Sequence, residues 1–573
     1  METNLGRFAG MACALGFGAA LLAGNGVAWA DTPDSASGGP ERTSAGPASP
    51  AHDTGTRAGR PLSESRGRVA PRPASTVAVE ARSYGGHPRA VVPPVRPAVV
   101  RTADQSSAAP VQQGTPAPEA SAVSAVAAAK APNPLFNNQT PTLAYNALEN
   151  NDANGQIEGD LHPFDPDSET LTYTATTPAF GTVAVNPNGT FVYTPGESFT
   201  GQDMFKVTVS DAGSGFHIHG FAGLINLLSL GLLGTSGHKT TETVFIGQQR
   251  TVVASGLTFP VDFRFLPDGR IVLAEKNGAI KMIGTDGTVL SQPVVSLGVN
   301  TLFERGISGL AVDPQFATNG YIYVAYTTSQ IKDRLSRLTV VGDTADPASE
   351  KVLLETADTV STSHRGGGLA FGPDGKLYWA KGDDGTGANA QDLTNLYGKI
   401  LRINPDGSTP SDNPVLGQGA LPQIYAYGFR NPYRLTFTPT GELLVADVGD
   451  LAFEELNHVT AGGNYGWPGA EGLCTSNCAG LTDPVFAYPH GAGAAFTAVL
   501  VRDGSKVIIA DEGQRWLKVL TCNSTFTSCG NPTSFDPKAG TTVALGQGPE
   551  PDSFYQLTYL PGTLTRITLA GSS

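Results

Sequence analysis

The chain has 573 residues and a net charge of −14, and its length predicts several domains. Only 15% of the residues are charged, and the chain contains 70 Gly and 42 Pro, a composition that favours short strands and turns over long helices. Residues 31–130 hold 11 Lys or Arg against 8 Asp or Glu and residues 1–30 are neutral, so the remaining chain carries a net charge of −17. An acidic folded part repels a phosphate backbone, which argues against nucleic-acid binding.

Residues 1–30 have the pattern of an export signal. Arg7 supplies the positive start, an apolar run follows, and Ala28-Trp29-Ala30 fits the small-x-small cleavage rule. A membrane anchor is the alternative, but Gly and Ala dilute the apolar run. The pattern predicts a protein that is secreted or associated with the cell envelope.

Four cysteines remain after such a cleavage, because Cys13 lies within the signal: Cys474, Cys478, Cys522 and Cys529. An even number in an exported chain indicates disulfides, with Cys474–Cys478 and Cys522–Cys529 as the simplest pairs. A zinc site is the alternative, although no histidine stands beside them at ligand spacing.

Residues 31–131 contain mainly Ala, Pro, Ser, Arg and Gly, a composition that buries too little apolar surface to offset chain entropy. We expect a disordered tether there. Residues 132–248 instead alternate apolar and polar side chains between turns such as Asn186-Pro187-Asn188-Gly189, which predicts a small β-sandwich.

The sandwich resembles the bacterial cadherin-like and Ig-like repeats of exported proteins. The matching segments are DPDSETLTY (165–173), GTVAVNPNGTFVYTP (181–195) and FTGQDMFKVTVSD (199–211). Four carboxylates there are either ligands of a structural calcium or turn-forming residues on a solvated rim: Asp160, Asp165, Asp167 and Asp211.

An apolar insertion, FHIHGFAGLINLLSLGLLG (residues 216–234), interrupts the strands of the sandwich. The run is too short and too rich in glycine for a membrane span, so we expect a packed helix, with a membrane-surface contact as the alternative. His217 and His219 lie at its start. No third ligand is evident nearby, and we interpret them as ordinary histidines.

Residues 249–573 contain a degenerate repeat of strand, turn and strand. The six copies are at 265–283, 312–327, 371–385, 437–450, 501–520 and 545–567. A spacing of roughly 50 residues suits four-stranded blades. The predicted fold class is therefore all-β: a disordered N-terminal tether, an Ig-like β-sandwich and a six-bladed β-propeller, with an open sandwich as the alternative to the propeller.

Several motifs lie beside these hairpins in one order. They are ERGISGLAVDPQF (304–316), HRGGGLAFGPDGKLYWAKGDD (364–384), LYGKILRINPDG (396–407), YGFRNPYR (427–434) and EELNHVTAGGNYGWP (454–468). Together they resemble the soluble glucose/sorbosone dehydrogenases, aldose dehydrogenases that use pyrroloquinoline quinone (PQQ). The resemblance covers about residues 252–570.

The resemblance implies that His364 is the base that takes the proton of the sugar hydroxyl, a task suited to histidine near neutral pH. Asp383 would orient His364 or contact the cofactor or sugar. The glycines at 366–368 are expected to leave room for a planar cofactor. Arg430, the second catalytic residue, and Asn431 match the pair beside the quinone, and Glu304 matches another position that lines the site.

The resemblance also implies calcium. Gly449 and Asp450 would offer backbone oxygens to a calcium that bridges to the cofactor, and Glu455 and Tyr465 match positions at a second calcium. The alternative is that these acidic residues only form turns and strand ends.

One feature departs from the family pattern. The family holds the carboxylates of PQQ with Lys or Arg from the last two blades, where this chain offers Arg515, Lys518 and Arg566, none in a clear match.

The resemblance predicts PQQ-dependent oxidation of an aldose sugar to a lactone, with an external electron acceptor. Contact with the cell wall or a membrane surface would be made by the linker, the Ig-like domain or residues 216–234. The alternatives are a noncatalytic envelope propeller that binds glycan or protein, and a calcium-dependent lactonase-type hydrolase.

Overall fold

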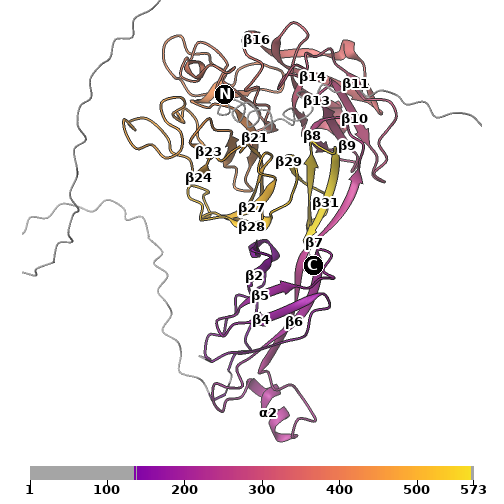
Figure 1. The fold of residues 1–573 in the computed structure, drawn as a ribbon, viewed down its shortest axis with the longest axis vertical. Helices are drawn as coiled ribbons and strands as arrows, with labels where there is room; N and C mark the ends of the chain where they lie inside the picture. The colour runs from indigo at the N-terminus through magenta and orange to yellow at the C-terminus, as the bar shows by residue number, and fades with distance from the viewer. Residues whose placement is uncertain (1–134, 137, 169, 570–573) are drawn as a thin grey trace, which may run out of the picture. The chain divides into compact units, whose positions relative to one another are not determined.

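The computed structural model describes residues 135, 136, 138–168 and 170–569 (Figure 1). The predicted export signal (1–30) and tether (31–131) lie outside these residues. The regular elements of the described part are almost all strands, as expected, and this part contains no helix that is long and apolar enough to span a membrane.

The N-terminal module (138–247) contains two sheets. Its elements are η1 (Ala147–Glu149), β1 (Asn151–Ala153), β2 (Gln156–Asp160), β3 (Thr172–Ala175), β4 (Gly181–Val185), β5 (Thr190–Pro195), β6 (Gln202–Ser210), α2 (Gly220–Leu228) and the first part of β7 (Lys239–Ala254). One sheet has the order β1-β2-β5-β4, and β3, β6 and β7 pair in the other. The alternation in β6 buries Phe205, Val207 and Val209 and turns Met204 outward, which gives the module its own core.

The apolar insertion forms α2, but its side chains are largely exposed, unlike the packed helix that the sequence predicts. Gly223 is the one residue of α2 that is buried. The exposed apolar side chains of this segment are Phe216, Phe221, Leu227, Leu228, Leu230, Leu232 and Leu233.

Six further sheets, numbered one to six in chain order, follow. Sheet one contains β8 (Pro260–Phe265), β9 (Ile271–Glu275), β10 (Ala279–Ile283) and β11 (Val295–Ser296), and sheet two contains β12 (Ile307–Val312), β13 (Tyr321–Thr327), β14 (Lys332–Val341), β15 (Thr344–Ala345) and β16 (Lys351–Asp358). Sheet three contains β17 (Leu369–Phe371), β18 (Leu377–Lys381), β19 (Lys399–Ile403) and β20 (Ile424–Tyr427), and sheet four contains β21 (Pro432–Phe437), β22 (Leu443–Asp447), β23 (Phe453–Val459) and β24 (Phe486–Pro489). Sheet five contains β25 (Phe496–Arg502), β26 (Lys506–Asp511), β27 (Trp516–Thr521) and β28 (Thr533–Asp536), and sheet six contains β29 (Thr542–Gln547), β30 (Ser553–Thr558) and β31 (Thr563–Leu569). Short helices α3 (Phe316–Asn319), η2 (Pro347–Ser349) and η3 (Gly387–Ala390) lie in the connections.

Each of the six predicted hairpins falls in a different sheet. It lies at, or just after, the turn between the first and second strands of that sheet. The turns are tight because glycine takes the left-handed backbone there, as at Gly375 (φ 70°) and Gly441 (φ 93°). The second strands are buried along their whole length in β9, β18, β22 and β26. This propeller-like arrangement therefore keeps apolar side chains between neighbouring sheets.

The sixth sheet is completed by β7, a strand that precedes sheet one in the chain. Residues 248–254 of β7 pair with β31, while residues 239–247 of the same strand pair with β6. One strand thus runs through the boundary that the sequence places at residue 248.

The four cysteines among the described residues form two disulfides, Cys474–Cys478 and Cys522–Cys529, which are the pairs predicted as simplest.

Candidate active site

The motif residues lie at one end of their sheets. His364 precedes the first strand of sheet three and Asp383 follows the second strand; Arg430 and Asp450 hold the equivalent places around sheet four. In an antiparallel pair the start of one strand lies beside the end of the next, as the register of Pro432 opposite Asp447 illustrates. Residues far apart in the sequence therefore meet at this edge.

The His364 imidazole is held by a carboxylate. Its Nδ1 lies 2.7 Å from Oδ1 of Asp383, and the Nε1 of Trp467 donates to Oδ2 of Asp383 over 2.8 Å. Because the carboxylate accepts, Nδ1 donates, and in the neutral form of the imidazole the lone pair is then on Nε2. His364 Nε2 is buried and makes no hydrogen bond within the described structure. The ring is poised to take a proton from a ligand.

The charge on Asp383 is favoured by its partners. Burial alone would raise the pKa of Asp383, but the hydrogen bonds from His364 and Trp467 and the charge of Arg430 outweigh burial, and the pKa lies below its usual value. The carboxylate therefore stays ionised beside the ring that it orients.

The backbone at His364 is fixed from sheet two. Glu304 accepts the N–H of His364 over 2.6 Å and that of Arg365 over 3.2 Å with the same oxygen. His364 has φ 59°, a left-handed conformation that is uncommon outside glycine and is held by these bonds.

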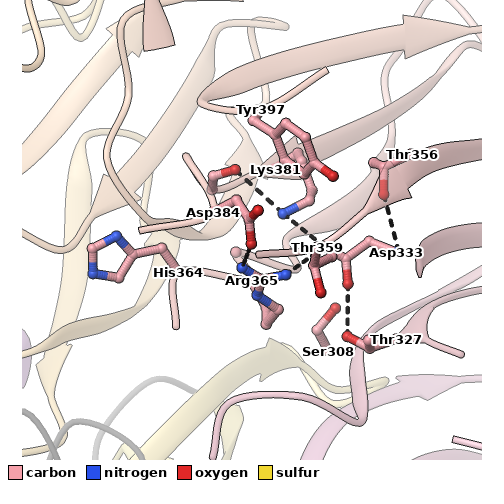
Figure 2. A network of polar contacts seen from close by, with 12 residues as sticks. Ser308, Thr327, Asp333, Thr356, Thr359, His364, Arg365, Lys381, Asp384 and Tyr397 are labelled. Carbon is pink, nitrogen blue, oxygen red and sulfur yellow. Dashed lines mark hydrogen bonds and ion pairs between the residues drawn. The ribbon is translucent and has the colours of Figure 1, made fainter. Parts of the chain in front are cut away.

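A buried ionic network lies directly behind His364, and Figure 2 shows the imidazole turned away from it. Arg365 pairs with Asp333 over 2.8 Å and also with Asp384. Lys381, which has no exposed surface, lies 3.0 Å from Asp333. Two cations and two anions thus balance inside the protein, which a buried ionic group requires.

Arg430 and Asn431 are anchored by one carboxylate. Asp447 accepts the backbone N–H of Arg430 over 3.0 Å and that of Asn431 over 2.7 Å. The guanidinium of Arg430 donates to Asp450 over 2.8 Å and lies 5.6 Å from the centre of the Trp467 ring. The side-chain oxygen of Asn431 accepts the N–H of Gly366 over 2.8 Å. Trp467 therefore touches both Asp383 and Arg430.

The loop after β22 is capped by Glu471, which accepts backbone N–H groups with one oxygen. Its donors are Asp450, Leu451, Ala452 and Phe453, at 2.6, 3.0, 3.1 and 3.3 Å. Gly449 has no room for a side chain, because a Cβ would lie 1.7 Å from the carbonyl oxygen of Phe453. The loop carrying Gly449 and Asp450 is thus held in one shape.

Several carboxyl groups are buried behind this loop. Burial raises the pKa of Asp447 well above its usual value, with the charge of Glu455 as the second cause, and burial raises the pKa of Glu455 to about 7. Glu455 accepts the N–H of Gly472 over 2.5 Å and the amide of Asn457 over 3.1 Å. The Oδ1 of Asn457 is buried and unpaired in the described structure.

Tyr465 is oriented by its own loop. Its hydroxyl donates to the carbonyl of His458 over 2.7 Å and accepts from the N–H of Thr460 over 3.0 Å. The ring stacks on Phe429 with 4.7 Å between centroids. The contacts of Tyr465 and those of Glu455 therefore involve different partners.

A narrow cavity opens beside Glu304 and is lined from five of the six sheets. Its lining residues are Val261, Lys276, Glu304, Ile307, Ser308, Arg365, Gly366, Tyr433, Val543 and Tyr559. Lys276 donates to the carbonyl of Thr301 over 2.6 Å, and burial lowers its pKa to about 8. Lys276 and Arg365 are the cations among these lining residues.

Glu512 brings an acidic group close to the same region. The side chain is buried, its Oε2 is unpaired within the described structure, and burial followed by the charge of Asp511 raises its pKa to about 8. Its charge acts on both Tyr433 and Tyr559. Sheets four and six thus each contribute a tyrosine, and sheet five contributes a carboxyl group, near the cavity.

The expected role of the glycines at 366–368 is wrong. A Cβ on Gly367 would lie 2.3 Å from the carbonyl oxygen of Ser308, and one on Gly366 would lie 2.7 Å from that of Ala380. A Cβ on Gly368 would meet the N–H of Leu435 at 3.0 Å. These glycines let neighbouring backbones pack against each other rather than leave space for a ligand.

Comparison with known proteins identifies the family of this chain. The family model for glucose/sorbosone dehydrogenases matches residues 257–490, and the model for a bacterial Ig domain matches residues 123–218. A crystal structure of an oxidoreductase of the glucose dehydrogenase type from Thermus thermophilus aligns over 56% of this chain and 100% of its own, with a TM-score of 0.52 and 30% identity. The chain belongs to the glucose/sorbosone dehydrogenase family.

The names of two further relatives refer to a quinone cofactor. Quinoprotein glucose dehydrogenase B of Acinetobacter calcoaceticus is 32% identical over 292 residues, which are 45% of this chain and 59% of that protein. The PQQ-bound aldose sugar dehydrogenase of Streptomyces coelicolor aligns over 56% of this chain and 98% of its own, with a TM-score of 0.50 and 25% identity. The chain spans about three fifths of the length of the curated relatives it first matches.

The three candidate cations of sheets five and six have other environments. Arg515 is exposed in the turn after β26, and Lys518 lies 4.1 Å from the centre of the Trp516 ring. Arg566 pairs with Glu550 over 3.3 Å. None of these three residues lines the cavity beside Glu304.

Sequence reasoning missed the roles of Trp467, Asp447 and Arg365. Trp467 stands in the motif GGNYGWP, and the need of a half-buried indole N–H for an acceptor was the available signal. No local signal joins Arg365 to Asp333, because their contact depends on the packing of sheet two against sheet three.

Proposed function

We propose that this member of the glucose/sorbosone dehydrogenase family oxidises an aldose sugar at its anomeric carbon to a lactone, with PQQ as the cofactor and an external electron acceptor. One observation carries the proposal. His364 is oriented by Asp383, and its buried Nε2 has no hydrogen-bond partner in the described structure. Arg430 lies beside Trp467, whose indole N–H also donates to Asp383.

The chemistry of the chain's own residues follows from this arrangement. Nε2 of His364 takes the proton of the anomeric hydroxyl, and Asp383 stabilises the imidazolium that results. Two electrons leave the anomeric carbon with its hydrogen, and its C–O bond becomes the carbonyl of the lactone. PQQ, when bound, supplies the hydride acceptor. Arg430 lends positive charge beside the group that gains the electrons.

The residues at the reacting end fit a quinone. Arg430 and Asn431 are fixed by Asp447, and the Nε of Arg430 is a buried donor without a partner in the described structure. A guanidinium suits an oxygen that gains negative charge. Lys276 is the cation of the cavity lining that would face carboxylates, because the guanidinium of Arg365 is already paired with Asp333 and Asp384, whereas Glu512 opposes such binding. We infer that this chain holds the carboxylates of PQQ with residues other than the Lys or Arg of the last two blades that the family uses.

We also propose calcium near the loop after β22. Gly449 and Asp450 would offer backbone oxygens to a bridging ion, and Glu455 with Tyr465 would belong to a second site. The chemistry of the donors supports this, because buried carboxylate and amide oxygens such as those of Glu455 and Asn457 are the ligands that calcium prefers.

We infer that sheets one to six are the six blades of a closed propeller. The first strand of each sheet contacts that of the next, and β29 of sheet six contacts β8 of sheet one. We further propose an exported or envelope-associated protein whose residues 216–234 or Ig-like module contact the cell surface. The exposed apolar side chains around α2 support that contact.

The experiment is reconstitution of the purified full chain with PQQ and calcium. Aldose-dependent reduction of an artificial electron acceptor is measured together with PQQ binding, for the wild type, His364→Ala and the control His458→Ala, whose ring pairs with Glu442 instead. We expect activity in the wild type and control only. Binding of glycan or protein without turnover would favour the noncatalytic propeller, and lactone hydrolysis without PQQ would favour the hydrolase.

A further inference from the structure

Four side chains converge in the N-terminal module, far from the motifs above in the sequence. They are Asp211, His217, His219 and His238, and one ligand atom from each of them lies within 4.8 Å of the other three. Asp211 and His217 have no exposed side-chain surface, and His238 retains 24%. The cluster is therefore nearly enclosed.

The fold brings these residues together from distant positions. β6 ends at Ser210, which pairs with Lys239 at the start of β7, so the next pair along the two strands is Asp211 and His238. His217 and His219 stand on either side of Ile218, which forms a β-bridge with Phe136. In an extended segment, alternate residues point to the same side. Both imidazoles therefore face the pair at the strand ends.

Short distances join the ligand atoms. Nδ1 of His238 lies 2.9 Å from Nε2 of His219, 3.0 Å from Nε2 of His217 and 3.0 Å from Oδ1 of Asp211. Oδ2 of Asp211 lies 3.2 Å from Nε2 of His219 and 3.3 Å from Nε2 of His217. Four ligands at about 2.0–2.1 Å from one ion in a tetrahedron would be about 3.3 Å apart.

Hydrogen bonds alone do not account for this geometry. One imidazole nitrogen carries either one proton or one lone pair, so Nδ1 of His238 makes a single hydrogen bond in the ring plane. It nevertheless lies within 3.0 Å of three polar atoms. A shared cation would satisfy all of these atoms at once.

The ring of His217 is also set for coordination. Its Nδ1 lies 2.9 Å from the carbonyl oxygen of Gly215, which only accepts, so Nδ1 carries the proton and Nε2 carries the lone pair. A backbone carbonyl behind a ligating histidine is the usual support of a metal site.

We propose that Asp211, His217, His219 and His238 bind one divalent zinc-class cation in a closed tetrahedral site. Three imidazoles and one carboxylate suit zinc, and four protein ligands leave no position for a substrate, which makes the site structural. The ion ties the ends of β6 and β7 to the residue before α2. It fixes the base of the segment that carries the exposed apolar side chains.

The test uses the untagged full chain, freed of metal by a chelator and then supplied with Zn²⁺ or Co²⁺. The test variants are His217→Ala and Asp211→Asn, and the control is His162→Ala, a histidine of the same module that pairs with Glu149. Metal content and the visible spectrum of Co²⁺ are measured, with the protease sensitivity of residues 212–237 as a separate readout.

We expect one Zn²⁺ per chain, a tetrahedral Co²⁺ spectrum and slower cleavage of residues 212–237 in the presence of metal. Both test variants should lose at least about 100-fold in zinc affinity, since even the partners behind a ligand contribute about 10- to 100-fold. The control should bind like the wild type. If His217→Ala does not fold, Asp211→Asn makes the same test with its side-chain volume preserved. Absence of stoichiometric zinc from the folded wild type, or unchanged binding in the folded variants, would overturn the proposal.

Discussion

Asp383 accepts a hydrogen bond from Nδ1 of His364 over 2.7 Å through one oxygen and a bond from Nε1 of Trp467 over 2.8 Å through the other. Both oxygens are therefore committed to side chains that line the candidate site. In the proposed mechanism Asp383 is a positioning residue, and it orients the base rather than contacting the cofactor.

Asp383→Asn should lower kcat by about 10²- to 10⁴-fold, because an amide no longer fixes the tautomer of His364 or stabilises its protonated form. The dissociation constant for PQQ should stay unchanged. Steady-state kinetics and a binding titration measure the two effects. Asp268→Asn, in the turn between β8 and β9, is the control, and a parallel loss of cofactor binding in Asp383→Asn would argue for direct contact instead.

Arg365→Met should destabilise the protein by about 3–5 kcal/mol, because it leaves the buried carboxylates of Asp333 and Asp384 short of one positive charge. Chemical denaturation measures the free energy of unfolding. The matched control is Arg270→Met, whose partners Asp268 and Asp343 are about half exposed, so that its loss should cost at most about 1 kcal/mol. Equal effects of the two substitutions would contradict the structural role of the network.

Glu512→Gln should change how the free energy of unfolding depends on pH. Burial raises the pKa of Glu512 from 4.5 to about 8, so the folded state binds more protons than the unfolded state between these values. The contribution of Glu512 is full below pH 4.5 and is lost as the pH rises through about 8.

The Gln variant should lie within about 1 kcal/mol of the wild type near pH 5 and exceed it by up to about 5 kcal/mol near pH 9, at ~1.4 kcal/mol per pH unit. Denaturation at a series of pH values measures the difference. A gap between the two proteins that is the same at pH 5 and pH 9 would refute the assignment.

Gly309→Ala should destabilise the protein by about 1–3 kcal/mol or more, because a Cβ there would lie 1.8 Å from the carbonyl oxygen of Gly367 in the next sheet. Gly298 has no atom within 4 Å of the equivalent position, so Gly298→Ala should be nearly neutral. Thermal unfolding of the two variants compares them. A stable Gly309→Ala protein would show that sheets two and three can separate at little cost.

The sequence predicted features that depend on neighbouring residues. The alternation in β6, the six hairpins and the disulfide between Cys522 and Cys529 follow from local patterns, and they are present. The pairing of His364 with Asp383 could also be anticipated, because one hairpin joins them.

Contacts between distant segments could not be predicted. His238 stands 19 residues beyond His219, and only the pairing of β6 with β7 brings it to Asp211. The glycines after His364 suggested open space, whereas their surroundings are the backbones of adjacent sheets. Burial of Glu512 likewise depends on packing that no local pattern encodes.

The proposed role of His364 is tested most directly by the rate at which an aldose reduces PQQ bound to the full chain, measured without oxygen in a single turnover. The wild type should react, and deuterium at the anomeric carbon should slow the reaction. His364→Gln should bind PQQ with the same affinity and react about 10²- to 10⁴-fold more slowly. Equal rates in the two proteins, or no reaction of the cofactor-loaded wild type with any aldose, would contradict the account.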